Sequence, residues 1–280
     1  MTPVAMNLAG VIETPAMPSS PYLIDVDGHP YVPLADSGVV LGVHVGDGVF
    51  DHDADHVAPG VTLAHADQAA RHALTTFACF GNRATVRSGA AAGAAGFVLG
   101  KRGEAGRVIV VFPDDVLARL APGDAVTVRA SGQGAELPGV ALLNADPEAL
   151  GLLPLVVGPS SVHSTVRVTV PSALAGNGIG RPAQMWDVDL QVTAETAAAA
   201  GLAGLRLGDL VAVDDLDVRH NMGYRRGFRT IGLIVHGGSP QPGHGPGLMP
   251  ILCGPADRLP VTVTEDVLPM LTPDALHFRP

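Results

Sequence analysis

Glycine and proline interrupt this sequence so often that long helices are excluded. The chain of 280 residues contains 35 Gly and 24 Pro, together about a fifth of its length. Glycine weakens the interior of helices and strands, and proline removes a backbone donor. Between these interruptions many runs alternate with β-branched residues, as in "TVRVTV" at 165–170. The pattern predicts many short strands joined by tight turns.

A short unit, Gly-Asp followed by valines, occurs in both halves of the chain. It begins at Gly46 ("GDGVF"), at Gly123 ("GDAVTV") and at Gly208 ("GDLVAV"). Glycine suits a turn, aspartate can hydrogen-bond its own turn, and the alternating residues begin a strand. We therefore expect two β-rich domains, at 1–150 and 151–280.

The helices expected from the sequence are few and short. In "ADQAARHALTTF" apolar residues stand at 66, 69, 70, 73, 74 and 77, which is one face of a helix that ends near Gly81 and Asn82. The runs "PDDVLARLAPGD" and "AETAAAAGLAGL" predict two more helices, and "WDVDLQV" predicts a strand. The expected fold is mainly β, with a multi-layer sandwich or barrel-like architecture and a few short packed helices.

Charge and cysteine content narrow the function classes. A net charge of −10 argues against a nucleic-acid groove and against binding to anionic membranes. No run is long and apolar enough to span a bilayer, and the first residues do not resemble a signal peptide. Two cysteines, Cys79 and Cys253, fit a reducing compartment better than a disulfide framework. We expect a cytoplasmic protein that acts on a small molecule.

Two segments are rich in histidine. "HVGDGVFDHDADH" at 44–56 could form a metal site, a solvated acidic loop or a polar pocket wall. "VHGGSPQPGHGPGLMP" at 235–250 follows a predicted strand that ends at His236, and it carries His244 in a loop that proline and glycine hold rigid. This loop could place an imidazole beside a pocket, form a plain turn, or bind a metal.

Three charged residues are candidates for substrate binding and proton transfer. Arg71 on the predicted helix and Arg83 after it could grip a carboxylate, or could be surface arginines. "GKRGEAG" places Lys101, Arg102 and Glu104 at a hairpin tip. Glu104 becomes a candidate proton acceptor if this tip folds over a pocket, and is solvated otherwise.

Several unusual strings occur in order along the chain, among them "GDGVFDHDADHVAPGVTL", "TFACFGNRATVRSGAAAGAAGFVLGKRG", "ALAGNGIG" and "TIGLIVHGGSPQPGHGPG". Together they resemble the bacterial and archaeal domain-of-unknown-function family numbered 4438, from about residue 35 to about residue 254. The resemblance implies a mostly β, multi-layer architecture.

At the level of the fold group, the chain is also similar to bacterial Pictet–Spengler cyclases, which form β-carbolines. That resemblance implies an arginine and a glutamate in the pocket, and Arg71 and Glu104 are the counterparts by neighbourhood in the chain. The predicted function is a cofactor-independent cyclase of specialised metabolism, in alkaloid biosynthesis, with no metal. It would condense a tryptophan-like amine with an aldehyde or ketone, with Glu104 as base, Arg71 as carboxylate anchor or carbonyl activator, and His236 or His244 as accessory acid. A homodimer is the expected assembly.

Two other functions fit the same residues. One is a metal-dependent hydrolase or lyase acting on a small molecule, with ligands from the 44–56 loop together with His236 and His244. The other is a non-catalytic β protein that binds a small ligand.

Overall fold

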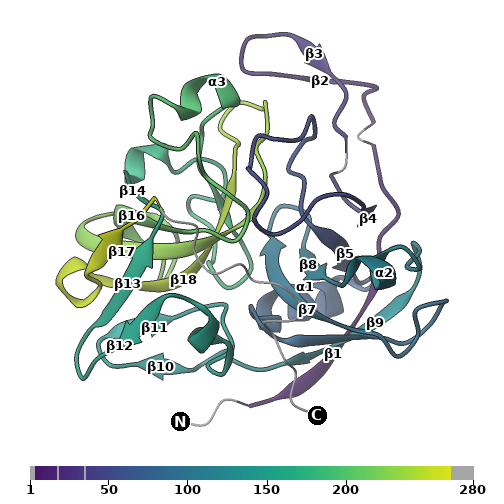
Figure 1. Cartoon of the computed structure of the whole chain (residues 1–280), viewed down its shortest axis with the longest axis horizontal. Coiled ribbons are helices and arrows are strands. Elements are labelled where there is room, and N and C mark those ends of the chain that lie inside the picture. The colour runs from purple at the N-terminus through teal and green to yellow at the C-terminus, as the bar shows by residue number, and fades with distance from the viewer. Residues whose placement is uncertain (1–3, 18, 35, 266–280) are drawn as a thin grey trace.

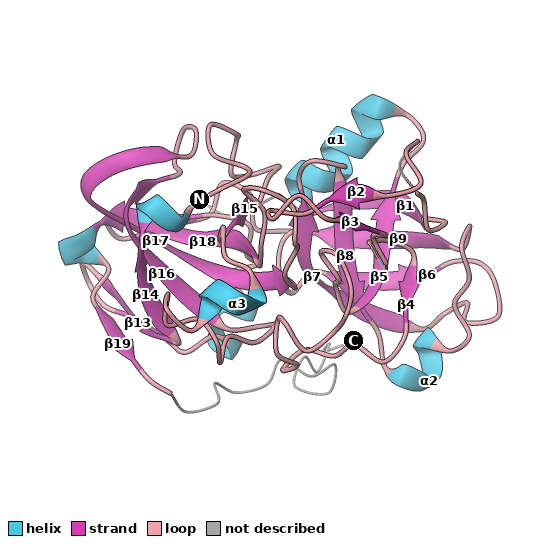
Figure 2. Cartoon of the chain, turned by 90° about the horizontal axis from the view of Figure 1, so that it is seen from above, coloured by secondary structure: helices cyan, strands magenta, loops and turns pink. Residues whose placement is uncertain are grey.

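The chain forms two groups of strands that lie side by side (Figure 1 and Figure 2). This computed structural model describes residues 4–17, 19–34 and 36–265, so that residues 1–3 and 266–280, at the outer ends of the two predicted domains, lie outside it together with 18 and 35. Strands make up 38% of the structure and the three α-helices are short, which confirms the mainly β prediction. No helix among the described residues is long and apolar enough to cross a membrane.

The first group is a closed antiparallel barrel of six strands, because its first and last strands also pair with each other. Closure removes the unpaired edges that an open sheet exposes. In order around the barrel the strands are β1 (Met6–Ile12), β9 (Ala125–Ala130), β6 (Arg83–Val86), β7 (Ala95–Arg102), β8 (Arg107–Val111) and β5 (Gly60–Ala64), and β4 (Val39–Val40) pairs with β5.

The second group is built on an open sheet. Its strands in order are β10 (Glu136–Leu137), β11 (Val140–Leu142), β18 (Gly247–Pro255), β17 (Gly223–His236), β16 (Leu210–Asp217) and β14 (Val168–Pro171), with β15 (Val188–Asp189) also pairing with β18. A smaller sheet holds β12 (Leu155–Val157), β13 (Val162–Val166) and β19 (Val261–Val263), and β2 (Leu23–Ile24) pairs with β3 (Pro30–Tyr31). The last barrel strand ends at Ala130, and the strands from Glu136 onward belong to the other sheets. The predicted division into domains at 150 stays a prediction.

The strongest helix prediction is confirmed by α1 (Gln68–Phe77). The Asp67 side chain caps it by accepting from the Ala70 N–H, and Gly81 takes a positive φ of 85° shortly after its end. The other two helices, α2 (Asp114–Leu117) and α3 (Ala194–Ala197), are shorter than the runs that predict them. The described residues also form three 3-10 turns: η1 (Ala149–Leu152), η2 (Ser172–Leu174) and η3 (Ala256–Arg258).

The repeated Gly-Asp unit forms the same turn each time. The carboxylates of Asp47, Asp124 and Asp209 each accept a hydrogen bond from the N–H three residues earlier, at 2.8, 2.9 and 2.9 Å. The glycines before them have φ of 104°, 93° and 92°, in the left-handed region that glycine adopts without strain. The repeat is therefore architectural, as its composition predicts.

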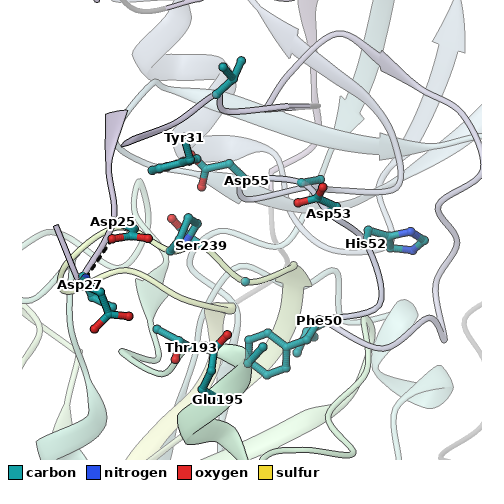
Figure 3. A pocket seen from close by; sticks show the side chains of 17 residues that line it. Asp25, Asp27, Tyr31, Phe50, His52, Asp53, Asp55, Thr193, Glu195 and Ser239 are labelled. Carbon is teal, nitrogen blue, oxygen red and sulfur yellow. Dashed lines mark hydrogen bonds between the residues drawn. The ribbon is translucent and has the colours of Figure 1, made fainter. Parts of the chain in front are cut away.

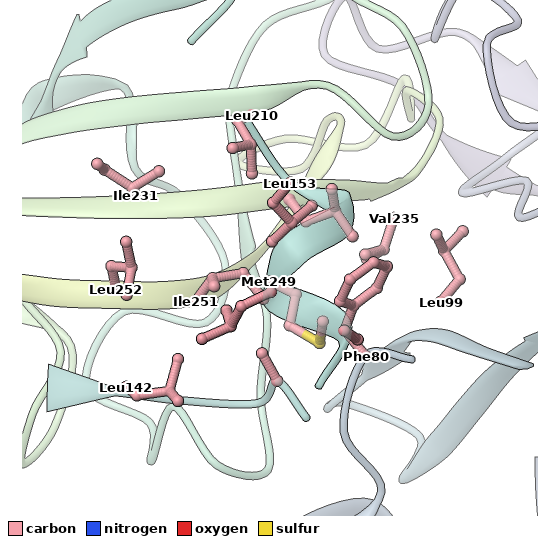
Figure 4. Close-up of a cluster of buried hydrophobic side chains, with 14 of the residues drawn as sticks. Phe80, Leu99, Leu142, Leu153, Leu210, Ile231, Val235, Met249, Ile251 and Leu252 are labelled. Atoms are coloured by element: carbon pink, nitrogen blue, oxygen red, sulfur yellow. The ribbon is translucent and has the colours of Figure 1, made fainter. Parts of the chain in front are cut away.

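One apolar core joins the barrel to the second sheet. Phe80, near the end of α1, and Leu99 on β7 pack with Val235 on β17 and Met249 on β18, all fully buried (Figure 4). Because side chains from both groups share this core, separating the groups would expose large apolar side chains to water. The two halves of the chain therefore stabilise each other.

A buried lysine lies beside this junction. Lys101 is fully buried, and its ammonium donates to Asn144 Oδ1 at 3.0 Å and to the Gln184 carbonyl oxygen at 2.9 Å. These contacts include no carboxylate, so burial lowers the Lys101 pKa to about 8 from its ordinary 10.5.

This shift predicts a pH dependence of stability. Between pH 8 and 10.5 the unfolded chain holds a proton that folded Lys101 has released, so the free energy of unfolding rises with pH in this window. Between pH 8 and 10.5 the free energy of unfolding of the wild-type protein is expected to rise by about 3 kcal/mol relative to that of Lys101→Met. Urea unfolding of both proteins at several pH values measures the difference, and a difference that does not change with pH would contradict the prediction.

Candidate metal centre

The Gly/Pro-rich segment 235–250 brings two histidines toward the middle of the molecule. His236 is the last residue of β17, where a bulge shifts the register with β18 between Ile234 and His236. Bulges re-aim side chains near functional sites. A Cβ on Gly247, which pairs with His236, would lie 2.0 Å from His236 Nε2. Glycine at 247 therefore leaves room for the imidazole ring.

The other histidine-rich segment contributes His56. Its N–H donates to the Gly238 carbonyl oxygen at 2.9 Å, and the Gly237 N–H donates to the Val57 carbonyl oxygen at 2.8 Å. These bonds tie residues 56–57 to residues 237–238, so the ring centroids of His56 and His236 lie 5.1 Å apart. Segments about 180 residues apart in the sequence thus share one site.

Strand β15 and the residue just before it supply two carboxylates, Asp189 and Asp187. Asp189 pairs with Gly247, the same residue that lies opposite His236. Side chains alternate along a strand, so Asp187 and Asp189 are on one face. Both are almost inaccessible to solvent, at 2% and 3% exposure, and His236 is at 0%. We call His56, Asp187, Asp189, His236 and His244 the His–Asp cluster.

The outer part of the cluster is a triangle of three ligand-type atoms. His56 Nε2 lies 2.9 Å from His244 Nδ1 and 3.7 Å from Asp189 Oδ2. His244 Nδ1 lies 3.0 Å from the same Asp189 oxygen. The His244 side chain is 22% exposed, so this triangle has one edge toward solvent.

The inner part of the cluster lies deeper. His236 Nε2 is 2.8 Å from Asp187 Oδ2 and 3.4 Å from Asp189 Oδ1. His236 Nδ1 lies 2.9 Å from the Gly237 carbonyl oxygen, which can only accept, so Nδ1 carries a proton. The Gly103 N–H donates to Asp187 Oδ1 at 3.0 Å.

A second layer of polar groups orients the outer part. Asp55 Oδ1 lies 2.6 Å from His56 Nδ1, which leaves Nε2 facing His244 and Asp189. The other oxygen of Asp55 accepts from the Tyr31 hydroxyl at 3.0 Å. A carboxylate behind a ligating histidine fixes its tautomer and raises its basicity.

The carboxylates give the cluster a negative electrostatic potential. Burial disfavours an imidazolium at His236, but Asp187 and Asp189 outweigh it and raise the His236 pKa to about 10. Burial also opposes the charged form of Asp189, yet hydrogen bonds from His236 and the other two histidines hold its pKa well below the usual value. Positive charge, whether on protons or on a metal ion, is therefore favoured here.

Two adjoining hollows lie beside the cluster, with volumes of about 220 and 440 Å³. Asp55 lines the first (Figure 3) and His244 lines the second. Both are bounded by Val26 and Asp27 at the β2–β3 turn and by Glu195 on α3. The acidic side chains around the first hollow are Asp25, Asp27, Asp53, Asp55 and Glu195. A small molecule in the second hollow would reach His244, and one in the first would reach Asp55, which lies behind His56.

The structure separates the four predicted catalytic residues into two sets. His236 and His244 are in the cluster, whereas Glu104 and Arg71 lie at the ends of an ion-pair network. The network runs through Glu104, Arg102, Asp36, Arg107, Glu13 and Arg71.

Both ends of this network already have partners within the chain. Burial of the Glu104 carboxyl is outweighed by the Arg102 guanidinium, and the pKa of Glu104 is lowered, which makes it a weak base. Arg71 is occupied by Glu13 at 3.7 Å and by the Ala105 carbonyl oxygen at 3.0 Å. Lys101 and Arg102 are buried at the end of β7, whereas Glu104 lies in the turn at 103–106 and keeps 29% of its side chain exposed.

The sequence predicts part of the His–Asp cluster. His56 lies in the 44–56 segment, but His44 and His52 of that segment bind Asp47 instead, with His52 Nε2 3.2 Å from Asp47 Oδ2. Asp187 and Asp189 were not among the candidates. Their signal was an Asp-x-Asp pair on one face of a predicted strand, a pattern that is also typical of a solvated face.

The fold and the cluster define a mainly β protein with a buried histidine and carboxylate centre. The chain matches the N-terminal DUF4438 domain of unknown function over residues 22–151 and the C-terminal one over 153–267. It therefore belongs to the DUF4438 family, as its sequence resemblance predicts. A solved structure entitled "Crystal structure of TM1086" is similar, with 33% sequence identity, a TM-score of 0.90 and coverage of 95% of each chain. No curated protein matches.

Proposed function

We propose that this protein is a metal-dependent hydrolase or lyase that acts on a small molecule. The observation that carries the proposal is the triangle formed by His56 Nε2, His244 Nδ1 and Asp189 Oδ2, with sides of 2.9, 3.0 and 3.7 Å.

The size of this triangle suits a first-row transition metal. Ligand atoms at about 2.0–2.2 Å from a tetrahedral zinc ion are roughly 3.3–3.6 Å from one another. Two sides of the triangle are slightly shorter than this separation and one is slightly longer. Small shifts of the side chains would therefore bring all three atoms to metal-binding distance. Two histidines and one carboxylate suit Zn²⁺, and the same set also binds Fe²⁺ in other proteins.

The surroundings of the triangle support a catalytic ion more than a structural one. Three protein ligands leave a further coordination position for water or substrate, whereas structural zinc sites have four. His244 borders the larger hollow, from which a substrate could approach. A zinc ion in such a site acts as a Lewis acid and lowers the pKa of bound water. Asp55, behind His56, would hold that ligand in its orientation.

Metal binding tests the proposal directly. Protein stripped with a chelator and reloaded with Zn²⁺, or anaerobically with Fe²⁺, is expected to retain metal after gel filtration, measured by elemental analysis. His244→Ala should lower the affinity of the triangle for metal by about 100-fold or more, because it removes a ligand. His72→Ala is the matched control, since His72 is exposed on α1 and bonds Gln68.

Activity then tests the reaction class. The reloaded protein is compared with the stripped protein on esters, lactones, amides and phosphate monoesters, with His244→Ala as the inactive control. Retention of less than about a tenth of an equivalent of metal by the wild-type protein would contradict the proposal.

The condensation of a tryptophan-like amine with an aldehyde or ketone stays a prediction, as does the homodimer. His236, His244 and the hollows are compatible with it, but Glu104 is held by Arg102. Formation of tetrahydro-β-carbolines by chelator-treated protein, lost in Glu104→Gln, would favour the cyclase over the metal enzyme.

A further inference from the structure

Asp189 has two oxygens that face different partners. Its Oδ2 is 3.0 Å from His244 Nδ1, in the outer part of the His–Asp cluster. Its Oδ1 is 3.4 Å from His236 Nε2, in the inner part. A carboxylate placed between two sets of nitrogen and oxygen ligands is the group that bridges paired metal ions.

The inner set is as fully organised as the outer one. His236, Asp187 and Asp189 form a group whose ligand atoms, one from each residue, all lie within 4.8 Å of one another. Each side chain other than Asp189 is anchored by the atom that faces away from the group. The Gly237 carbonyl oxygen holds His236 Nδ1, and the Gly103 N–H holds Asp187 Oδ1. Anchors of this kind orient ligands in metal sites.

The buried carboxylates lie near a cation that is shared with other acidic groups. Arg102 interacts electrostatically with Asp187, but it is already paired with Asp36 and Glu104. Buried carboxylates are stable only when they are paired or bind metal. Asp187 and Asp189 therefore depend on the three histidines or on metal ions for positive partners.

We propose that Asp189 bridges two cation positions: an outer one with His56 and His244, and an inner one with His236 and Asp187. The outer position rests on the proposed function above, and the inner position extends it. Catalytic pairs of metal ions are typically about 3.5–4 Å apart and together clamp the attacking and leaving oxygens of a substrate. The substrate class would then be an ester, a phosphate ester or another molecule cleaved by metal-activated water.

Burial makes the two positions unequal. His244 is 22% exposed at the wall of a hollow, whereas His236 is fully buried. The outer position therefore lies nearer to solvent than the inner one. The outer ion is therefore expected to exchange with chelator first, and the inner ion more slowly.

The number of bound ions tests the bridge. Stripped wild-type protein is titrated with Mn²⁺, and the ions retained are counted by elemental analysis. We expect two equivalents for the wild type and for His72→Ala, and one each for His244→Ala and Asp187→Asn. The asparagine keeps the oxygen that accepts from Gly103. Electron paramagnetic resonance should show a spin-coupled pair in the wild type and an isolated Mn²⁺ in both variants.

The outcomes separate this inference from the proposed function. One equivalent in the wild type, lost in His244→Ala and kept in Asp187→Asn, would overturn the bridge and leave the proposed function standing. One equivalent that is lost in Asp187→Asn and kept in His244→Ala would overturn both the outer site and the bridge. Failure to retain Mn²⁺, Zn²⁺ or Fe²⁺ would overturn both proposals. The wild-type count and its resonance spectrum need no variant, so a poorly folded Asp187→Asn leaves the test intact.

Discussion

Asp189→Asn is expected to abolish metal-dependent stabilisation and to destabilise the metal-free protein. The asparagine removes the negative charge that His56, His236 and His244 share. Removing one partner of a buried ion pair costs about 3–5 kcal/mol. With Zn²⁺ at about 100 times its dissociation constant, the wild type gains about 2.7 kcal/mol. The variant should gain none.

Thermal and urea unfolding with and without Zn²⁺ measure both effects. Asp214→Asn is the matched control, because Asp214 forms a partly exposed ion pair with Arg229. Its cost should stay below about 1 kcal/mol, and its response to Zn²⁺ should equal that of the wild type. An Asp189→Asn protein that is stabilised by Zn²⁺ as strongly as the wild type would show that Asp189 is not a ligand.

Gly247→Ala is expected to displace the His236 ring and to disrupt the cluster through a single methyl group. The added carbon would lie 2.0 Å from His236 Nε2 and 2.2 Å from Cδ2, far inside van der Waals contact. The ring is fully buried and has little space to move. Overpacking of this kind lowers the free energy of unfolding by about 1–3 kcal/mol. The displaced imidazole would also lose its contact with the Asp187 carboxylate.

Gly151→Ala is the matched control for this substitution. A Cβ at Gly151 meets no atom within 4 Å, so the change should alter stability by less than about 1 kcal/mol. Unfolding by urea gives the stability of both variants, and Zn²⁺ titration gives their affinity. If Gly247→Ala bound Zn²⁺ as tightly as the wild type, the inferred position of the ring would be wrong.

The fold class and its local turns could be predicted from the sequence because their causes are local. The apolar spacing in α1, the cap at Asp67 and the three Gly-Asp turns depend on neighbouring residues. The closure of the barrel could not be predicted, because the pairing of β1 with β5 joins segments about 50 residues apart. Likewise "TVRVTV" reads as one strand, yet β13 and β14 lie in different sheets.

The candidate site was only half predictable for the same reason. His236 and His244 stood out because proline and glycine surround them. Asp187 and Asp189 were hidden in a strand pattern whose polar face is usually solvated. Only the pairing of β15 with β18 turns that face toward His236. Glu104 and Arg71 were reasonable candidates by chemistry, but the sequence could not reveal the partners that neutralise them.

The ligands come from distant parts of the chain, and this sets when the centre can assemble during synthesis. The half of the chain that leaves the ribosome first contributes His56 alone, while the other four members of the His–Asp cluster lie between residues 187 and 244. A nascent barrel would therefore hold a single member of the proposed metal site. On the proposed function, metal binding would follow the docking of the second sheet, and the bound ion would link the two halves of the molecule.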